Sequence, residues 1–196
     1  MRVTIERSAL LKALNHIQSV VERRYTIPIL SNVMISAASD EIRLSATDLD
    51  IEVVENVRAD VSQGGATTVP AHMMYDIVRK LPDGSQLELE RGPDEGRLMV
   101  ISGRSRFALQ ALPPEDFPDL AAGEFTNEFS IAASDLKHLI DKTRFAISTE
   151  ETRYYLNGIY FHTIEAGDGH RIRAVATDGH RLAQAELASP EGAEGM

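Results

Sequence analysis

An internal repeat constrains the fold of this chain more than any other feature. Residues 3–14 and 129–140 both alternate apolar and polar side chains, reach a serine, and continue with helical apolar spacing. The two serines, Ser8 and Ser134, are 134 − 8 = 126 positions apart. The motif Ala-Thr-Asp also occurs twice, 130 positions apart, at residues 46–48 and 176–178. Repeats of this length indicate copies of a domain and not the short turns of a solenoid.

The periodicity of the chain predicts an α+β fold. Apolar residues at helical spacing predict helices over residues 8–22, 71–81 and 134–145, with Ser8 and Ser134 as N-caps of the first and third. Alternating segments bounded by turn residues predict strands at 2–6, 31–37, 41–46, 51–59, 66–69, 86–90, 97–102 and 106–112. The first domain is therefore expected to pack two helices against antiparallel sheets.

A proline-rich, acidic segment divides the chain. Residues 112–118 read Leu-Pro-Pro-Glu-Asp-Phe-Pro, and this composition is typical of a domain boundary. We predict a first domain over residues 1–120, a linker over 121–127 and a second domain over 128–196. The second domain has one helix with its following strands but no second helix-plus-strands half, so we expect a fragment of a longer protein.

Composition excludes several kinds of site. The chain has no cysteine, so it has no disulfide, no thiol nucleophile and no thiolate metal site. No apolar run approaches the roughly 20 residues that a membrane helix needs, and the N-terminus lacks the apolar core of a signal peptide. The expected compartment is the cytoplasm.

The charge of the chain is unevenly distributed. The net charge is −10, yet residues 6–24, 71–81 and 134–145 hold nine Lys and Arg against five Asp and Glu. These helical windows therefore carry +4 and the remaining residues −14. Ordinary solvated helix faces would explain this difference, and so would a layer of helices that faces a polyanion while an acidic exterior repels other partners. Charge alone leaves both interpretations open.

Seven motifs occur in an order that is typical of one protein family. They span residues 28–32, 46–52, 67–71, 102–107, 112–118, 153–158 and 175–183. The last two, Arg-Tyr-Tyr-Leu-Asn-Gly and Val-Ala-Thr-Asp-Gly-His-Arg-Leu-Ala, are long and specific. Over essentially its whole length, the chain resembles the beta sliding clamps of bacterial DNA polymerase III. The resemblance implies the DNA-clamp fold and a non-catalytic processivity factor without a cofactor or metal.

The architecture of that family agrees with the repeat. Its subunits contain three copies of the domain and form a homodimeric ring, whose helices line the hole around duplex DNA and whose sheets lie outside. This chain would cover domain one and the first part of domain two. The resemblance also implies that DNA polymerase, clamp-loader subunits and repair proteins bind through short linear motifs.

By the same resemblance, the DNA-contact positions are Arg24, His72, Tyr154 and Tyr155. Arg24 could equally be a solvated loop arginine, and the two tyrosines could pack in or beside a strand. Glu150 lies where relatives place a polar DNA-contacting residue, but a carboxylate would repel phosphate, so we do not assign that contact to it.

The resemblance places a peptide-binding cleft at Arg153, Leu156, Thr177, Gly179, His180, Arg181 and Leu182. Leu156 and Leu182 would form an apolar floor, Gly179 would allow a tight turn, and the polar side chains would supply rim donors. Alternatively, this segment is a simple hairpin turn in which Asp178 bonds its own backbone. Because Asp48 repeats Asp178, we predict a structural role for Asp178.

A third patch comprises Arg104, Arg106 and Phe107. The resemblance implies that this edge meets the neighbouring subunit, whereas the spacing alone also fits a strand with exposed arginines and a buried phenylalanine.

Two other functions are alternatives to a clamp. The first is an enzyme, in which Asp178 and His180 on one face of a strand act as an acid/base pair, or in which His162, His170 and His180 bind a metal. The second is an acidic scaffold that binds peptides without DNA. The histidine spacing matches no metal signature.

Overall fold

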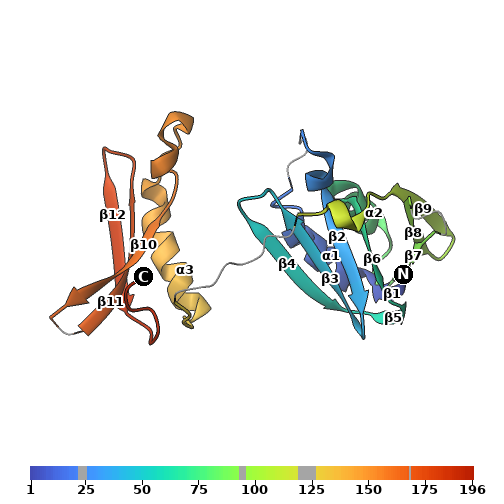
Figure 1. The fold of residues 1–196 in the computed structure, drawn as a ribbon, viewed down its shortest axis with the longest axis horizontal. Helices are drawn as coiled ribbons and strands as arrows, with labels where there is room; N and C mark the ends of the chain where they lie inside the picture. The colour runs from blue at the N-terminus through green and yellow to red at the C-terminus, as the bar shows by residue number, and fades with distance from the viewer. Residues whose placement is uncertain (22–25, 93–95, 119–126, 168) are drawn as a thin grey trace. The chain divides into compact units, whose positions relative to one another are not determined.

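The computed structural model describes residues 1–21, 26–92, 96–118, 127–167 and 169–196. The chain divides into two compact units, Met1–Ala121 and Ala122–Met196 (Figure 1). Each unit combines helices with antiparallel strands. The α+β fold class predicted from the sequence is therefore confirmed.

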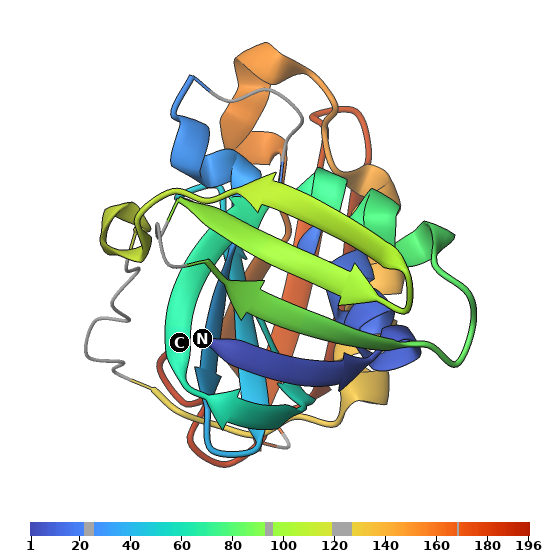
Figure 2. The same ribbon diagram turned by 90° about the vertical axis from the view of Figure 1, so that its right-hand side faces the viewer.

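The first unit contains two antiparallel sheets and two α-helices. The helices are α1 (Arg7–Ile17) and α2 (Ala71–Lys80), with short 3-10 segments η1 (Pro28–Ser31) and η2 (Pro114–Asp116). One sheet has the order β4-β3-β2-β6, formed by Glu52–Arg58, Glu41–Thr47, Asn32–Ala38 and Gly65–Pro70. The other has the order β5-β1-β7-β8-β9, formed by Asp60–Gln63, Arg2–Glu6, Gln86–Arg91, Arg97–Ser102 and Ser105–Gln110. Figure 2 looks onto this second sheet, with β1 in dark blue.

The core of the first unit lies where both helices meet the sheets. Leu10, Leu14 and Ile17 of α1 are fully buried, as are Met74 and Val78 of α2. The two helices pack against each other, and α1 also packs against β4. Each such side chain contributes roughly 1.5–3 kcal/mol when it is removed from water, so this apolar contact holds the helices on the sheets.

The second unit has elements that correspond to the first half of the first unit. It contains α3 (Ala133–Thr143), the 3-10 segments η3 (Arg144–Ala146) and η4 (Glu151–Leu156), and one sheet of order β10-β11-β12. Its strands are Tyr160–Ala166, Gly169–Thr177 and Leu182–Ala188. Helices α1 and α3 both have 11 residues and begin 126 positions apart.

The core of the second unit is smaller. Leu139, Ile172 and Ala174 are its central buried side chains. Leu136 and Ile140 of α3 are 37% and 38% exposed, whereas the matching Leu10 and Leu14 of α1 are buried. The difference arises because α2 covers α1, while the described part of the second unit has no second α-helix to cover α3.

The repeat predicted from the sequence is confirmed in the turn that follows β3 and β11. The Asp48 carboxylate accepts hydrogen bonds from the backbone of Asp50 and Ile51 at 3.0 and 2.7 Å. The Asp178 carboxylate accepts two equivalent bonds, both at 2.9 Å. The residue after each aspartate has a positive φ, 81° at Leu49 and 87° at Gly179. The two segments are copies of one turn.

The predicted serine caps were wrong. Glu6 is the N-cap of α1, and its carboxylate accepts a hydrogen bond from the Ala9 backbone at 3.0 Å, while Ser8 lies inside the helix and donates to Glu6. Ala132 occupies the N-cap of α3 and makes no side-chain cap. The long glutamate side chain reaches the first turn directly from the end of β1, so a serine is not needed there.

The end of α1 and the strand that follows β4 differ most from the sequence predictions. Helix α1 ends at Ile17 and not at residue 22, because the backbone of Ser19 and Val20 bonds only three residues back and tightens the chain into a turn. The predicted strand 51–59 is β4, and the sequence analysis missed β5, which follows it. The chain changes sheets between them, since β4 pairs with β3 and β5 pairs with β1.

Candidate functional site

The turn between β11 and β12 is fixed by hydrogen bonds inside the turn and by a hydrogen bond from Arg153 beside it. Inside the turn, Thr177 donates to the Arg181 carbonyl at 2.8 Å and accepts from the Gly179 backbone at 3.1 Å. From the side, the guanidinium of Arg153 donates to the Asp178 carbonyl at 3.1 Å. Arg153 also forms an ion pair with Glu150 at 3.1 Å. The turn therefore has a preformed geometry that does not depend on a ligand.

Gly179 allows the close approach of Arg153. Its φ of 87° favours glycine, and a Cβ at this position would lie 3.3 Å from Nη1 of Arg153. The sequence analysis expected such a tight turn here. The carboxylate of Asp178 bonds its own turn, which supports the structural role predicted for it.

The Asp178 carboxylate stays ionised to low pH. Hydrogen bonds from the backbone of Arg181 and His180, with a smaller contribution from the Arg181 guanidinium, lower the pKa of Asp178 from 3.8 to about 2. The enzyme interpretation placed Asp178 and His180 on one face of a strand, and that geometry was wrong, because both residues lie in the turn. The carboxylate is occupied as an acceptor.

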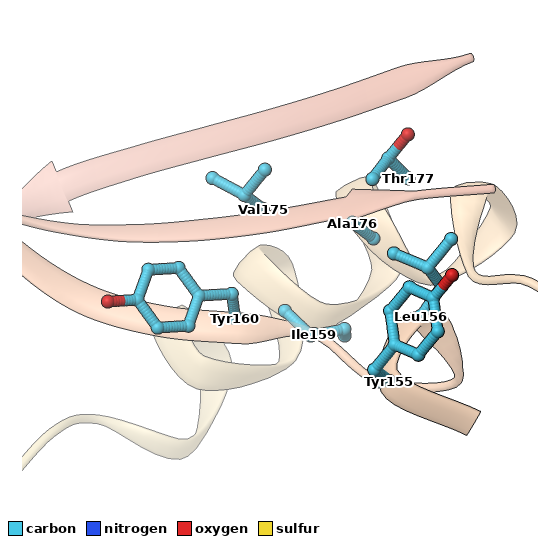
Figure 3. Close-up of a pocket in the computed structure, with 8 residues that line it drawn as sticks. Tyr155, Leu156, Ile159, Tyr160, Val175, Ala176 and Thr177 are labelled. Carbon is cyan, nitrogen blue, oxygen red and sulfur yellow. The ribbon is translucent and has the colours of Figure 1, made fainter. Parts of the chain in front are cut away.

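A cavity of about 270 Å³ lies beside this turn. Figure 3 shows Val175 and Thr177 pointing to the same side of β11, with Tyr155 and Leu156 of η4 near the end of that strand. Its full lining is Tyr155, Leu156, Gly158, Ile159, Tyr160, Val175, Ala176 and Thr177. The lining is mainly apolar, so the cavity suits an aliphatic or aromatic anchor side chain.

The remaining cleft candidates lie on the open surface next to the cavity. Leu182 pairs with Thr177 in the β11–β12 ladder and is 63% exposed, so it does not form a buried floor. His180 and Arg181 are also exposed. Arg181 forms an ion pair with Asp178 at 2.9 Å and lies 5.7 Å from the ring centre of Phe145. The site thus combines an apolar cavity, an exposed leucine and a basic rim.

Tyr154 and Tyr155 do not pack in a strand. They lie in η4, are 79% and 71% exposed, and meet edge to face with ring centres 5.8 Å apart. The alternative of strand packing was therefore wrong for both. Two exposed aromatic rings on one short segment can contact a ligand without any rearrangement.

The other DNA-contact candidates are placed differently. Arg24 lies outside the described residues. His72 is half-buried on α2, and its Nε2 donates to the Val21 carbonyl at 2.7 Å, while its Nδ1 is buried without a partner. This arrangement requires the tautomer with hydrogen on Nε2. This hydrogen bond connects α2 to the chain that follows α1.

Only some of the basic side chains on the helices could contact an anionic ligand, because others already bind groups of this chain. Arg7 is 12% exposed and donates to the Val78 and Arg79 carbonyls at 3.1 and 2.8 Å, so it caps the C-terminal end of α2. Arg79 and Lys137 form ion pairs within their own helices. The exposed lysines without an ion pair in the described part of these helices are Lys12, Lys80 and Lys142.

A second apolar cavity lies between α2 and β9. It has a volume of about 540 Å³, and its lining includes Met73, Ile77, Leu81 and Phe107. Met73 is 53% exposed, and Phe107 also packs against the core. Arg104 and Arg106 are exposed near one end of the strand that carries Phe107. Met73, Ile77, Leu81 and Phe107 thus form an apolar hollow, whereas Arg106, the neighbour of Phe107 in an extended strand, faces the other side of the sheet.

In the part of the chain that the structure describes, no group of three or more His, Asp or Glu residues is arranged to hold a metal ion. His162 stacks on Tyr160 with ring centres 4.5 Å apart. No helix among the described residues is long and apolar enough to cross a membrane.

Comparisons with known proteins assign the family. Residues 1–121 match the family described as DNA polymerase III beta subunit, N-terminal domain, and residues 130–195 match its central domain. The chain belongs to the DNA polymerase III beta-subunit family. Its resemblance to beta sliding clamps, recognised from the seven motifs, is thereby confirmed.

Individual relatives of this beta-subunit chain match along its full length. The beta sliding clamp of Caulobacter vibrioides is 56% identical over 196 residues, which is 100% of this chain and 53% of the relative. A crystal structure of the C. crescentus beta sliding clamp with PEG bound to its putative beta-motif tethering region has a TM-score of 0.97 at 56% identity, with 100% and 52% of the two chains covered. A Bartonella birtlesii sliding clamp bound to griselimycin has a TM-score of 0.95 at 54% identity, with the same coverage. The chain spans about half the length of these relatives.

Sequence reasoning missed part of the cavity in this beta-subunit chain. Ile159, Tyr160 and Val175 line it beside Leu156 and Thr177, which the motifs had indicated. Val175 could have been predicted from the alternation of side chains along β11, because it must share a face with Thr177. The contribution of Tyr160 depends on the β10–β11 register, in which it pairs with Val175.

Proposed function

We propose that this chain is part of a sliding clamp, a non-catalytic processivity factor that encircles duplex DNA and tethers a DNA polymerase. The family assignment over both units supports this proposal. The observation that carries it is the preformed site in the second unit, where Arg153 braces the turn beside an apolar cavity. A cavity next to an exposed leucine and basic side chains fits a short linear motif with an apolar end.

The partners in this proposal are DNA polymerase and clamp-loader subunits, which would bind this cleft in turn. The relative from C. crescentus has a putative beta-motif tethering region, and its likeness to this chain supports a tethering role here. The proposed cleft comprises Arg153, Leu156, Thr177, Gly179, His180, Arg181 and Leu182, to which the structure adds Ile159, Tyr160 and Val175 as cavity-lining residues. The proposed location is the cytoplasm.

Binding of DNA in this proposal is sequence-independent. A ring that slides must attract phosphates without reading bases, so a few cations and exposed polar rings suffice. Arg24, Tyr154 and Tyr155 are the proposed contacts, and the exposure of both tyrosines supports them. His72 is proposed as a positioning residue for the chain at Val21, since its Nε2 hydrogen is already donated.

Closure of the ring requires a contact between subunits. The hollow at Met73, Ile77 and Phe107 is the proposed surface. Arg104 and Arg106, at the end of the strand that carries Phe107, are proposed to belong to the same interface. An apolar hollow of this size can take side chains of a neighbouring copy, and the arginines would pair with its acids. The family relatives are about twice as long, so this contact belongs to the full-length homodimer.

Retention on DNA tests this function. The full-length protein, loaded onto closed circular DNA, should remain bound in high salt and should dissociate once the circle is linearised. A topological link is insensitive to salt, whereas contacts with phosphates are not. A protein that binds clamp-motif peptides but never stays on closed circles would instead be an acidic peptide scaffold.

A further inference from the structure

The turn between β3 and β4 in the first unit presents apolar side chains where its copy in the second unit has a glycine and an arginine. Leu49 corresponds to Gly179, and Ile51 corresponds to Arg181, by the 130-residue offset. Leu49 is 46% exposed and Ile51 is 56% exposed. Val54 follows Glu52 by two positions on the exposed face of β4, and we call Leu49, Ile51 and Val54 the first-unit turn patch.

The counterpart of this patch is the turn that Arg153 braces. Ile27 corresponds to Arg153 by the 126-residue offset that relates α1 to α3. In the second unit, Arg153 approaches Gly179 closely. The first unit therefore repeats the backbone of the proposed partner-binding turn but changes the chemistry of its surface from basic to apolar.

Leu49 combines a strained backbone with a partly exposed side chain. Its φ of 81° lies in the left-handed region, where the Cβ of an L-residue crowds the following carbonyl. Glycine makes the same turn without strain in the second unit, at Gly179. The Leu49 side chain is not in the core, so packing does not explain the leucine. Strain of this kind at an exposed position indicates a surface with a binding role.

The charge around the patch restricts what can bind it. Asp48, Asp50 and Glu52 flank the two apolar residues of the turn. Asp50 and Glu52 are exposed and form no ion pair with the described residues. Arg43 of β3 lies opposite Asn56 on the same sheet face as Val54, so a cation borders the patch on the side away from the turn. The apolar side chains of the turn therefore have carboxylates beside them on the turn side.

We propose that the first-unit turn patch is a docking surface for a partner-protein segment in which apolar side chains are flanked by lysine or arginine. The apolar side chains would cover Leu49 and Ile51, and the cations would pair with Asp50 and Glu52. The acidic rim repels nucleic acid and acidic peptides. This surface lies in a different unit from the proposed cleft, so it is a site beyond the function proposed above. It rests on that function only where the two turns are compared.

Two peptides that share one Leu-Phe anchor test the proposal, one with lysines and one with glutamates on both sides of the anchor. Fluorescence anisotropy titrations of this chain should give a dissociation constant at least about tenfold smaller for the lysine peptide at low salt. Leu49→Gly keeps the turn and removes the side chain, so the variant should fold and bind the lysine peptide at least about fivefold more weakly. Changing both Asp50 and Glu52 to lysine should reverse the preference between the peptides.

The same titrations are repeated on Leu182→Asp, because the Leu-Phe anchor also suits the apolar cavity of the proposed cleft. The preference for the lysine peptide and its dependence on Leu49 should persist in this background, so that a failure of the proposed cleft and a failure of this patch give different results. Equal binding of both peptides, no effect of Leu49→Gly, or no binding of the lysine peptide near 1 mM would each overturn the proposal. A self-associated chain that Leu49→Gly converts to monomer would also overturn it, because the occupant would then be a second copy.

Discussion

Leu49 and Gly179 occupy the same position in two copies of one turn, with φ values of 81° and 87°. Each follows an aspartate whose carboxylate accepts two backbone hydrogen bonds from the residues beyond it. The shared backbone explains why Asp48 and Asp178 are repeated. The side chains that the two turns expose differ, so the two units present surfaces of different chemistry around the same backbone.

The backbone of this turn predicts opposite effects for two substitutions. Leu49→Gly should raise the free energy of unfolding of the first unit by up to about 1 kcal/mol, because relief of left-handed strain outweighs the added freedom of the unfolded chain. Gly179→Ala should lower the stability of the second unit by about 1–2 kcal/mol, because it adds strain and a Cβ 3.3 Å from Arg153. Urea denaturation of each variant would measure both, and changes of the same sign would contradict the shared geometry.

The lowered pKa of Asp178 predicts how the second turn responds to acid. Because the folded pKa is about 2 and the ordinary value is 3.8, the ionised carboxylate stabilises the folded state fully above about pH 4, and this contribution is lost as the pH falls toward 2. The melting temperature of Asp178→Asn should therefore lie below that of the unchanged chain at pH 6, and the gap should close toward pH 2.

Asp50→Asn is the control for that titration. The Asp50 carboxylate is exposed and makes no hydrogen bond within the described part of the chain, so its removal should not reproduce the pH-dependent gap. A gap for Asp178→Asn that widened in acid would show that the carboxylate is not held by its turn.

Phe107 should matter for association as well as for folding, since it also packs against the core of the first unit. In the full-length protein, Phe107→Ala should raise the dimer dissociation constant at least about tenfold, since it removes an apolar anchor from the hollow beside α2. Gln110→Ala on the same strand, at an exposed position outside the hollow, should leave the constant unchanged. Analytical ultracentrifugation measures both, and equal effects of the two variants would remove Phe107 from the interface.

Periodicity and the repeat made much of the fold predictable. The spacing of Leu10, Leu14 and Ile17 indicated the buried face of α1, and the recurring Thr-Asp pair indicated the copied turn. The caps were not predictable in this way, because Glu6 competes with Ser8 from the end of β1. Strand β5 was missed because its pairing with β1 depends on a change of sheet that no local pattern records.

The candidate site was only partly predictable for a similar reason. The motifs indicated Arg153, Leu156 and Thr177, which the structure brings to one turn and one cavity. They could not show that Tyr154 and Tyr155 lie in a 3-10 segment with exposed rings, since aromatic residues also favour strands. The exposure of Leu182 depends on its ladder position opposite Thr177, which is a tertiary property.

The proposed full-length protein has two separate binding functions, a peptide cleft and a DNA-encircling ring. Clamp-motif peptide titration and DNA retention at several salt concentrations, measured on the same full-length variants, separate the two. Leu182→Asp should weaken peptide binding by about 2 kcal/mol or more and leave DNA retention intact, because a charge is placed against the apolar anchor. Arg24→Glu should weaken DNA contact, lower its salt dependence and leave peptide affinity unchanged. Loss of both activities in both variants would contradict the two-site account and indicate unfolding instead.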